Sequence, residues 1–183
     1  MSNISMTTSK RNAIVTVMLI SAFVSMLNQT ILNTALPAII KGLNITETTA
    51  QWLITGFMLV NGIMIPLTAF LMDKYSTRHL YIFSMAIFLI GSIVAAFSPT
   101  FTILMISRII QAIGAGILLP LMQFTVFTLF PAEQRGFAMG LAGVVVQSAP
   151  AIGPTLTGLF VDLFSWRMPF YLVSAIAAVA FKI

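Results

Sequence analysis

Charged residues divide this chain of 183 residues into long runs that contain no Asp, Glu, Lys or Arg. A helix that crosses the hydrocarbon core of a bilayer needs about 20 mostly apolar residues, so an uncharged apolar run of about 18 or more predicts a membrane span. The uncharged runs cover residues 13–40, 48–72, 80–107, 109–132, 136–161 and 168–181. Within the third run, the turn sequence Ser98-Pro99-Thr100 separates a helix that ends near Phe97 from one that begins near Phe101.

These runs predict an all-α integral membrane protein with six transmembrane helices. Open sheet edges cannot be satisfied in lipid, and the runs lack the strict alternation of barrel strands. Composition agrees, because 59% of the residues are hydrophobic and only 7% are charged, against about 25% charged in soluble domains. The predicted helices cover approximately residues 13–37, 48–72, 79–97, 101–129, 136–160 and 166–183.

The distribution of basic residues predicts the orientation of the chain. Those on the side of the N-terminus are Lys10, Arg11, Lys74, Arg78, Arg135 and Lys182, and those on the opposite side are Lys41 and Arg167. Because the side richer in Lys and Arg is cytoplasmic, we expect a multi-pass plasma-membrane protein with a cytoplasmic N-terminus. The net charge of +5 fits this topology and contact with anionic lipid, and it does not predict nucleic-acid binding.

The sequence AFLMDKYSTRHL, residues 69–80, forms the predicted loop between the second and third helices. It holds four of the fourteen ionisable side chains of the chain (9 Lys and Arg, 4 Asp and Glu, 1 His): Asp73, Lys74, Arg78 and His79. His79 has no neighbour at a spacing typical of a metal site. We therefore expect no metal here.

This loop resembles G-x-L-x-D-R-x-G-R-R/K, the signature of the major facilitator superfamily of transporters. The matching residues are Leu71, Asp73, Lys74 and Arg78. Ala69 and Ser76 stand where the signature has glycines, and Thr77 stands where it has an arginine. In the superfamily the aspartate helps to latch the two halves in the outward-facing state. The resemblance thus implies a gating role for Asp73, Lys74 and Arg78, and the alternative is that Lys74 and Arg78 only anchor the topology.

Four further stretches resemble the same superfamily, in the expected order. LNQTILNTALP (27–37) is similar to the first-helix motif of its drug and proton antiporters, and SRIIQAIGAG (107–116) to the R-x-x-Q-G-x-G of helix four. GLAGVVVQSAPAIGPTLTG (140–158) resembles the antiporter motif ending G-P-x-x-G-G, and SWRMPFY (165–171) the opening of helix six in fourteen-helix antiporters. The resemblance implies the N-terminal six-helix half of a major facilitator fold, with the C-terminal half absent, no cofactor, and a proton gradient as energy source.

Two short segments support an internal repeat. DKYSTR (73–78) and DLFSWR (162–167) share Asp, Ser and Arg at the same spacing, after predicted helices two and five. They lie on opposite sides of the predicted membrane. We therefore expect a 3+3 inverted repeat, as in other facilitator halves.

The fifth predicted helix carries small residues at steps of three or four, which places them on one face. They are Gly136, Gly140, Gly143, Ala151, Pro154 and Gly158, and Gln147 lies on the same face. The antiporter motif itself supplies Gly140, Gly153, Pro154 and Gly158, and by resemblance this face meets a helix of the other half. The alternative is close packing within the six helices, since small-residue interfaces are common among membrane helices.

Polar side chains within the spans are the expected substrate contacts. They are Ser25 and Asn28 on the first helix, Gln51 and Thr55 with Met58 on the second, and Gln147 on the fifth. A lining of Met and Phe with few polar groups suits varied amphipathic ligands. Trp52 and Trp166 begin their helices on the outer side, so we expect both in an aromatic belt.

Arg108 and Gln111 share a face of the fourth predicted helix, about two turns from its start. A charge inside a membrane helix costs about 2.5–3.5 kcal/mol on insertion scales, which indicates a function. We expect this pair to couple proton entry to drug exit, and the alternative is that Arg108 reaches to the outer surface. Many drug antiporters carry aspartate where Asn28 stands, and all four acids here map to loops or helix ends.

The leading functional hypothesis is the N-terminal half of a proton-coupled multidrug exporter that works by alternating access. Its partners would be lipid, amphipathic small molecules, and the missing half or a second copy of the chain. The alternatives are a facilitator for a specific metabolite, or a six-helix fragment without transport that acts as a membrane interaction partner. An enzyme is not expected, because the sequence has no phosphate-binding loop, no H-E-x-x-H and no cysteine.

Overall fold

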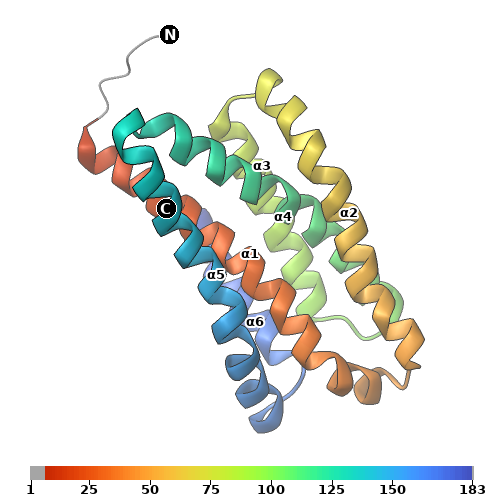
Figure 1. Cartoon of the computed structure of the whole chain (residues 1–183). Helices are drawn as coiled ribbons and strands as arrows, with labels where there is room; N and C mark the ends of the chain where they lie inside the picture. Colours follow the sequence, from red (N-terminus) through yellow and green to blue (C-terminus); the bar gives the residue numbers. More distant parts are fainter. Residues whose placement is uncertain (1–6, 183) are drawn as a thin grey trace.

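The computed structural model describes residues 7–182 and contains six helices within that range (Figure 1). Five of them are long and apolar enough to cross a membrane, and the apolar stretch Met168–Phe181 of the sixth is shorter. The helices are α1 Thr8–Leu43, α2 Glu47–Lys74, α3 Thr77–Ala96, α4 Phe101–Leu129, α5 Ala132–Leu163 and α6 Met168–Lys182. The prediction of an all-helical membrane protein is confirmed.

Three of the helices begin at a hydroxyl side chain that caps the first turn. Thr46 accepts a hydrogen bond from the backbone N–H of Thr49 at 3.2 Å, and Thr100 accepts one from Ile103 at 3.4 Å. Ser76 caps α3 in the same way. Each hydroxyl satisfies one of the N–H groups that the first turn of a helix leaves without a partner.

Several helix ends differ from the predicted bounds. α1 continues past Pro37, where we expected it to end, and ends at Leu43, before Asn44, which adopts the left-handed conformation with φ 51°. Pro37 lies on an exposed face, whereas Ile39 beyond it is fully buried, so packing maintains the helix through the lost backbone hydrogen bond. α5 begins at Ala132, before its uncharged run, because a helix can extend beyond the hydrocarbon core.

The packing of the helices follows the expected inverted repeat. α1 lies along α5, and α4 lies along α2, as Figure 1 shows. α3 packs on α6, and α1 packs on α4. If α1, α2 and α3 are exchanged with α4, α5 and α6, the contact of α1 with α5 becomes the contact of α4 with α2. The contacts of α3 with α6 and of α1 with α4 each map onto themselves. The arrangement therefore has the symmetry of a 3+3 repeat.

The two tryptophans have different surroundings. Trp52 is 57% exposed, as expected for an aromatic belt, whereas Trp166 is only 7% exposed. A Cβ atom at Gly42 would come within 2.9 Å of Trp166 Cδ1, so the indole packs directly on the backbone at the end of α1. The belt position expected for Trp166 is wrong, because glycine at position 42 leaves room for the indole to pack against the end of α1, where it is buried.

Candidate functional site

A buried polar network joins α1, α3 and α4. Arg108 is 1% exposed, and its Nη1 donates a hydrogen bond to Gln111 Oε1 at 2.7 Å. The same oxygen accepts a bond from Asn28 Nδ2 at 3.3 Å, and Gln111 Nε2 donates to Ser92 Oγ at 3.0 Å. Ser92 in turn donates to the carbonyl of Phe88 at 2.8 Å. Gln111 is thus the centre of the network, and the surface position considered for Arg108 is wrong.

A close approach of α3 and α4 makes this network possible. A Cβ atom at Gly91 would come within 2.8 Å of the backbone nitrogen of Gln111 and 3.0 Å of the carbonyl of Ser107. A larger residue at this position would separate the helices. Ser92, the next residue, would then lose its contact with Gln111. We did not predict this contact between α3 and α4. The pair Gly91-Ser92 inside an apolar run is the sequence feature that could have indicated it.

The charge of Arg108 has no carboxylate nearby in the described part of the chain. The four acidic residues, Glu47, Asp73, Glu133 and Asp162, lie in the end turns of α2 and α5. Arg108 instead stacks on the Phe57 ring at 4.2 Å, a cation–π contact. Arg108 Nε and Asn28 Oδ1 are buried without a hydrogen-bond partner among the described residues. The network therefore holds a positive charge that no carboxylate of the described residues neutralises, in a low-dielectric interior.

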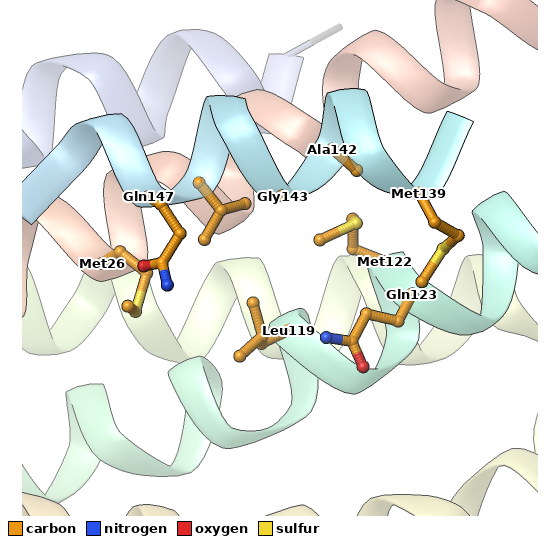
Figure 2. Close-up of a pocket in the computed structure, with 9 residues that line it drawn as sticks. Met26, Leu119, Met122, Gln123, Met139, Ala142, Gly143 and Gln147 are labelled. Carbon is orange, nitrogen blue, oxygen red and sulfur yellow. The ribbon is translucent and has the colours of Figure 1, made fainter. Parts of the chain in front are cut away.

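A pocket of about 210 Å³ opens between α1, α4 and α5. Figure 2 shows Gln147 on α5 and Gln123 on α4 at its two ends, with Met26, Met122 and Met139 around them. Flexible, polarisable methionine side chains adapt to ligands of different shape. Among the predicted substrate contacts, Gln147 is the one that lines this pocket.

The other predicted substrate contacts are not gathered at the pocket. Asn28 is fully buried in the network, and Ser25 is 7% exposed. Gln51, Thr55 and Met58 lie on an exposed face of α2. The structure therefore brings Asn28 to Arg108 and Gln111, leaves the α2 residues on the surface of the six-helix unit, and does not test substrate contact at any of them.

The predicted latch lies at the end of α2 and the start of α3. Asp73 is exposed in the last turn of α2, and no ion pair to it is found among residues 7–182. Lys74 Nζ lies 4.4 Å from the centroid of the Phe70 ring. Arg78 is exposed in the first turn of α3. A partner for Asp73 would therefore come from outside these six helices, and the latch stays a prediction.

The small-residue face of α5 points mainly outwards. A Cβ atom at Gly136, Gly140, Gly143 or Gly158 would have open space around it. Pro154 and Gln147 are also exposed. Gly153, by contrast, packs against Thr30 of α1. The alternative of close packing within the six helices thus holds at Gly153, while the rest of the motif faces away from them.

Comparison with known proteins decides the family. A model of the Major Facilitator Superfamily matches residues 18–183. The chain belongs to the Major Facilitator Superfamily. This is a family of transporters, so the chain is a multi-pass membrane protein embedded in lipid.

Relatives within the superfamily include named resistance proteins. The chain is 53% identical over 169 residues to the uncharacterized MFS-type transporter YcnB of Bacillus subtilis, covering 92% of this chain and 36% of that protein. It is 40% identical to the lincomycin resistance protein LmrB of Bacillus subtilis, covering 90% and 36%. It is 35% identical to the probable multidrug resistance protein EmrY of Escherichia coli, covering 80% and 29%. The chain spans about a third of the length of these relatives.

Membership confirms the resemblance predicted from the loop and helix motifs. Motif reading nevertheless missed residues that the major facilitator fold brings to the site. Phe57 was not predicted, and its only signal was a position one turn after Leu53 on the buried face of α2. Gln123 was also missed, although a glutamine within an apolar run of a transporter helix is a candidate for ligand contact.

Proposed function

We propose that this chain is one six-helix bundle of a proton-coupled multidrug exporter of the plasma membrane, with a cytoplasmic N-terminus. It works by alternating access together with a second bundle. The buried Arg108, which has no carboxylate partner among the described residues, carries the proposal, because a charge held inside a membrane bundle at this cost indicates a role in energy coupling. The names of the relatives, lincomycin resistance and multidrug resistance, support drugs as substrates.

Arg108 acts as a fixed charge and not as the proton carrier. A guanidinium retains its proton at physiological pH. At about 10 Å and an effective dielectric constant of about 20, a unit charge stabilises a carboxylate by roughly 1.7 kcal/mol. We propose that such a carboxylate lies in the second bundle, since the acids of this chain are at helix ends. Proton binding there removes the attraction and favours the alternate conformation.

The second bundle would pack against the outward face of α5. This face offers small residues with open space around Gly140, Gly143 and Gly158. Such residues allow another helix backbone to approach closely. Gln147 lies on the same face and borders the methionine-rich pocket, so substrate would bind between the two bundles. This arrangement matches the midplane sites of other transporters built from repeats.

Dye efflux from energised membrane vesicles tests the proposal. A complete transporter, made by joining this chain to a second bundle from a relative, should export ethidium when a proton gradient is present and stop when the gradient is collapsed. The 183-residue chain alone should insert without exporting the dye, because one bundle cannot rock against another. Efflux at the same rate with and without the proton gradient would refute proton coupling. Efflux by the 183-residue chain alone would refute the need for a distinct second bundle.

A further inference from the structure

A second cavity, of about 660 Å³, lies where α1 and α3 begin and α4 ends, and Phe181 near the end of α6 also lines it. These three ends lie at the same end of the molecule in Figure 1. Its walls are mostly apolar and include Ile14, Val17, Ile82 and Phe124, with the hydroxyl side chains of Tyr81, Thr125 and Thr128 among them. Thr77 and Arg78 lie at its α3 border. We call it the α1–α3–α4 cavity.

The inverted repeat contains an equivalent place at the opposite end of the bundle. Positions 77 and 78 correspond to positions 166 and 167, because the shared segments begin at Asp73 and Asp162. At the opposite end Trp166 fills the space against Gly42. Arg167 Nη2 donates a hydrogen bond to the carbonyl of Ser98 at 3.0 Å, and its guanidinium stacks on Trp166 at 4.4 Å. That place is therefore packed with protein.

At the α1–α3–α4 cavity the corresponding residues leave the space open. Thr77 has a much smaller side chain than Trp166. Arg78 is exposed and has no hydrogen-bond or ion-pair partner among residues 7–182. The two equivalent places thus differ. Trp166 and Arg167 fill the one at the end of α1, whereas the one at the start of α1 is open and has Arg78 beside it.

The charges around this cavity favour an anionic occupant. Lys10 lies three, four and seven residues before Ala13, Ile14 and Val17, so it continues the same face of α1 beyond the cavity. It is exposed, as is Arg78. No acidic residue is found among the described residues that line the cavity. One cation, Arg78, therefore borders this groove, and a second, Lys10, lies about one turn beyond it along α1.

We propose that the α1–α3–α4 cavity binds one anionic phospholipid of the adjoining leaflet. Arg78 and Lys10 hold the phosphate group, and one acyl chain lies along Ile14, Val17 and Phe124. Arginine matches a phosphate with two parallel hydrogen bonds, and basic residues at a membrane surface attract anionic headgroups. The acyl chain buries apolar surface that the shorter Thr77 leaves uncovered. This proposal needs membrane insertion alone and does not depend on transport.

Native mass spectrometry of the purified 183-residue chain tests the site. The detergent-solubilised chain is titrated with phosphatidylglycerol and, separately, with phosphatidylcholine. We expect one tight phosphatidylglycerol and weaker binding of phosphatidylcholine. Arg78→Gln and Lys10→Gln should each weaken phosphatidylglycerol binding about fivefold. Lys41→Gln is the matched control, because Lys41 is an exposed lysine at the other end of the same helix, and it should bind as the wild type does.

A second variant separates the groove from the charge. Thr77→Trp copies the residue of the filled end while retaining Arg78, and it should lose the tight phosphatidylglycerol because the indole occupies the acyl site. Excess inorganic phosphate should not displace the lipid from the wild type. Equal binding of the two lipids by the wild type would overturn the proposal, and so would unchanged phosphatidylglycerol binding in Arg78→Gln or in Thr77→Trp.

Discussion

Arg108 and Gln111 are joined by a 2.7 Å hydrogen bond inside α4, where Arg108 is 1% exposed. The accepting oxygen of Gln111 also receives the amide of Asn28, 83 residues earlier in the chain. One side-chain carbonyl thus solvates a buried cation and links two helices. Loss of that carbonyl leaves a charge in the interior without its partner, which is more costly than the loss of an ordinary hydrogen bond.

Gln111→Leu should therefore destabilise the chain by about 2–3 kcal/mol, because a buried charged donor loses its acceptor. Thermal unfolding in detergent, followed by tryptophan fluorescence, measures the effect. Gln147→Leu is the control, since Gln147 is exposed and should change stability by no more than about 0.5 kcal/mol. Equal melting temperatures for the two variants would show that the network does not stabilise the bundle.

Arg108 variants test the coupling role in the complete transporter. Arg108→Lys keeps the charge but not the planar geometry, so it should retain part of the efflux. Arg108→Ala and Arg108→Gln should lose proton-driven efflux while still being expressed. Efflux is measured over a range of external pH. Normal proton-driven transport in Arg108→Ala would leave the residue with a structural role only.

Gly153→Val should reduce the yield of folded chain, because even a Cβ atom at this position would overlap Thr30 of α1. Gly143→Val should be tolerated in the chain alone, since a Cβ atom there has open space around it. Size-exclusion profiles of the two variants in detergent give the comparison. If the two profiles are equally monodisperse, α1 and α5 do not need their close contact at Gly153.

Asp73→Asn should leave membrane insertion intact but remove most transport by the complete protein, because hydrogen bonds accepted by a charged carboxylate are roughly twice as strong as neutral ones. Asp162→Asn is the matched control from the other repeat, and it should transport normally. Initial rates of dye efflux at equal expression give the measurement. Wild-type rates in Asp73→Asn would show that the loop between α2 and α3 only sets the orientation of the chain in the membrane.

Single cysteines test the orientation, since the chain has none of its own. Thr48→Cys, at the start of α2, should react with a membrane-impermeant maleimide in intact cells. Tyr75→Cys, just after the end of α2, should react only after the cells are opened, because we expect the basic side of the protein to be cytoplasmic. The reverse pattern would invert the proposed topology.

The number and positions of the six helices could be predicted from the sequence, because the thickness of a bilayer fixes how long each apolar run must be. The shared face of Arg108 and Gln111 could also be predicted, since three residues along a helix return to the same side. Helix ends were less accurate, as α1 shows: its continuation past Pro37 depends on burial of Ile39, which no local pattern encodes.

The partners of these side chains were decided by tertiary structure. Asn28 meets Gln111, and Ser92 meets Gln111, because each helix takes one rotation and one distance relative to its neighbours. Those are set by the fit of whole surfaces, with Gly91 against α4 and Gly42 against Trp166. A glycine in a sequence shows that a close approach is possible there, but only the packed bundle determines which residue fills the space.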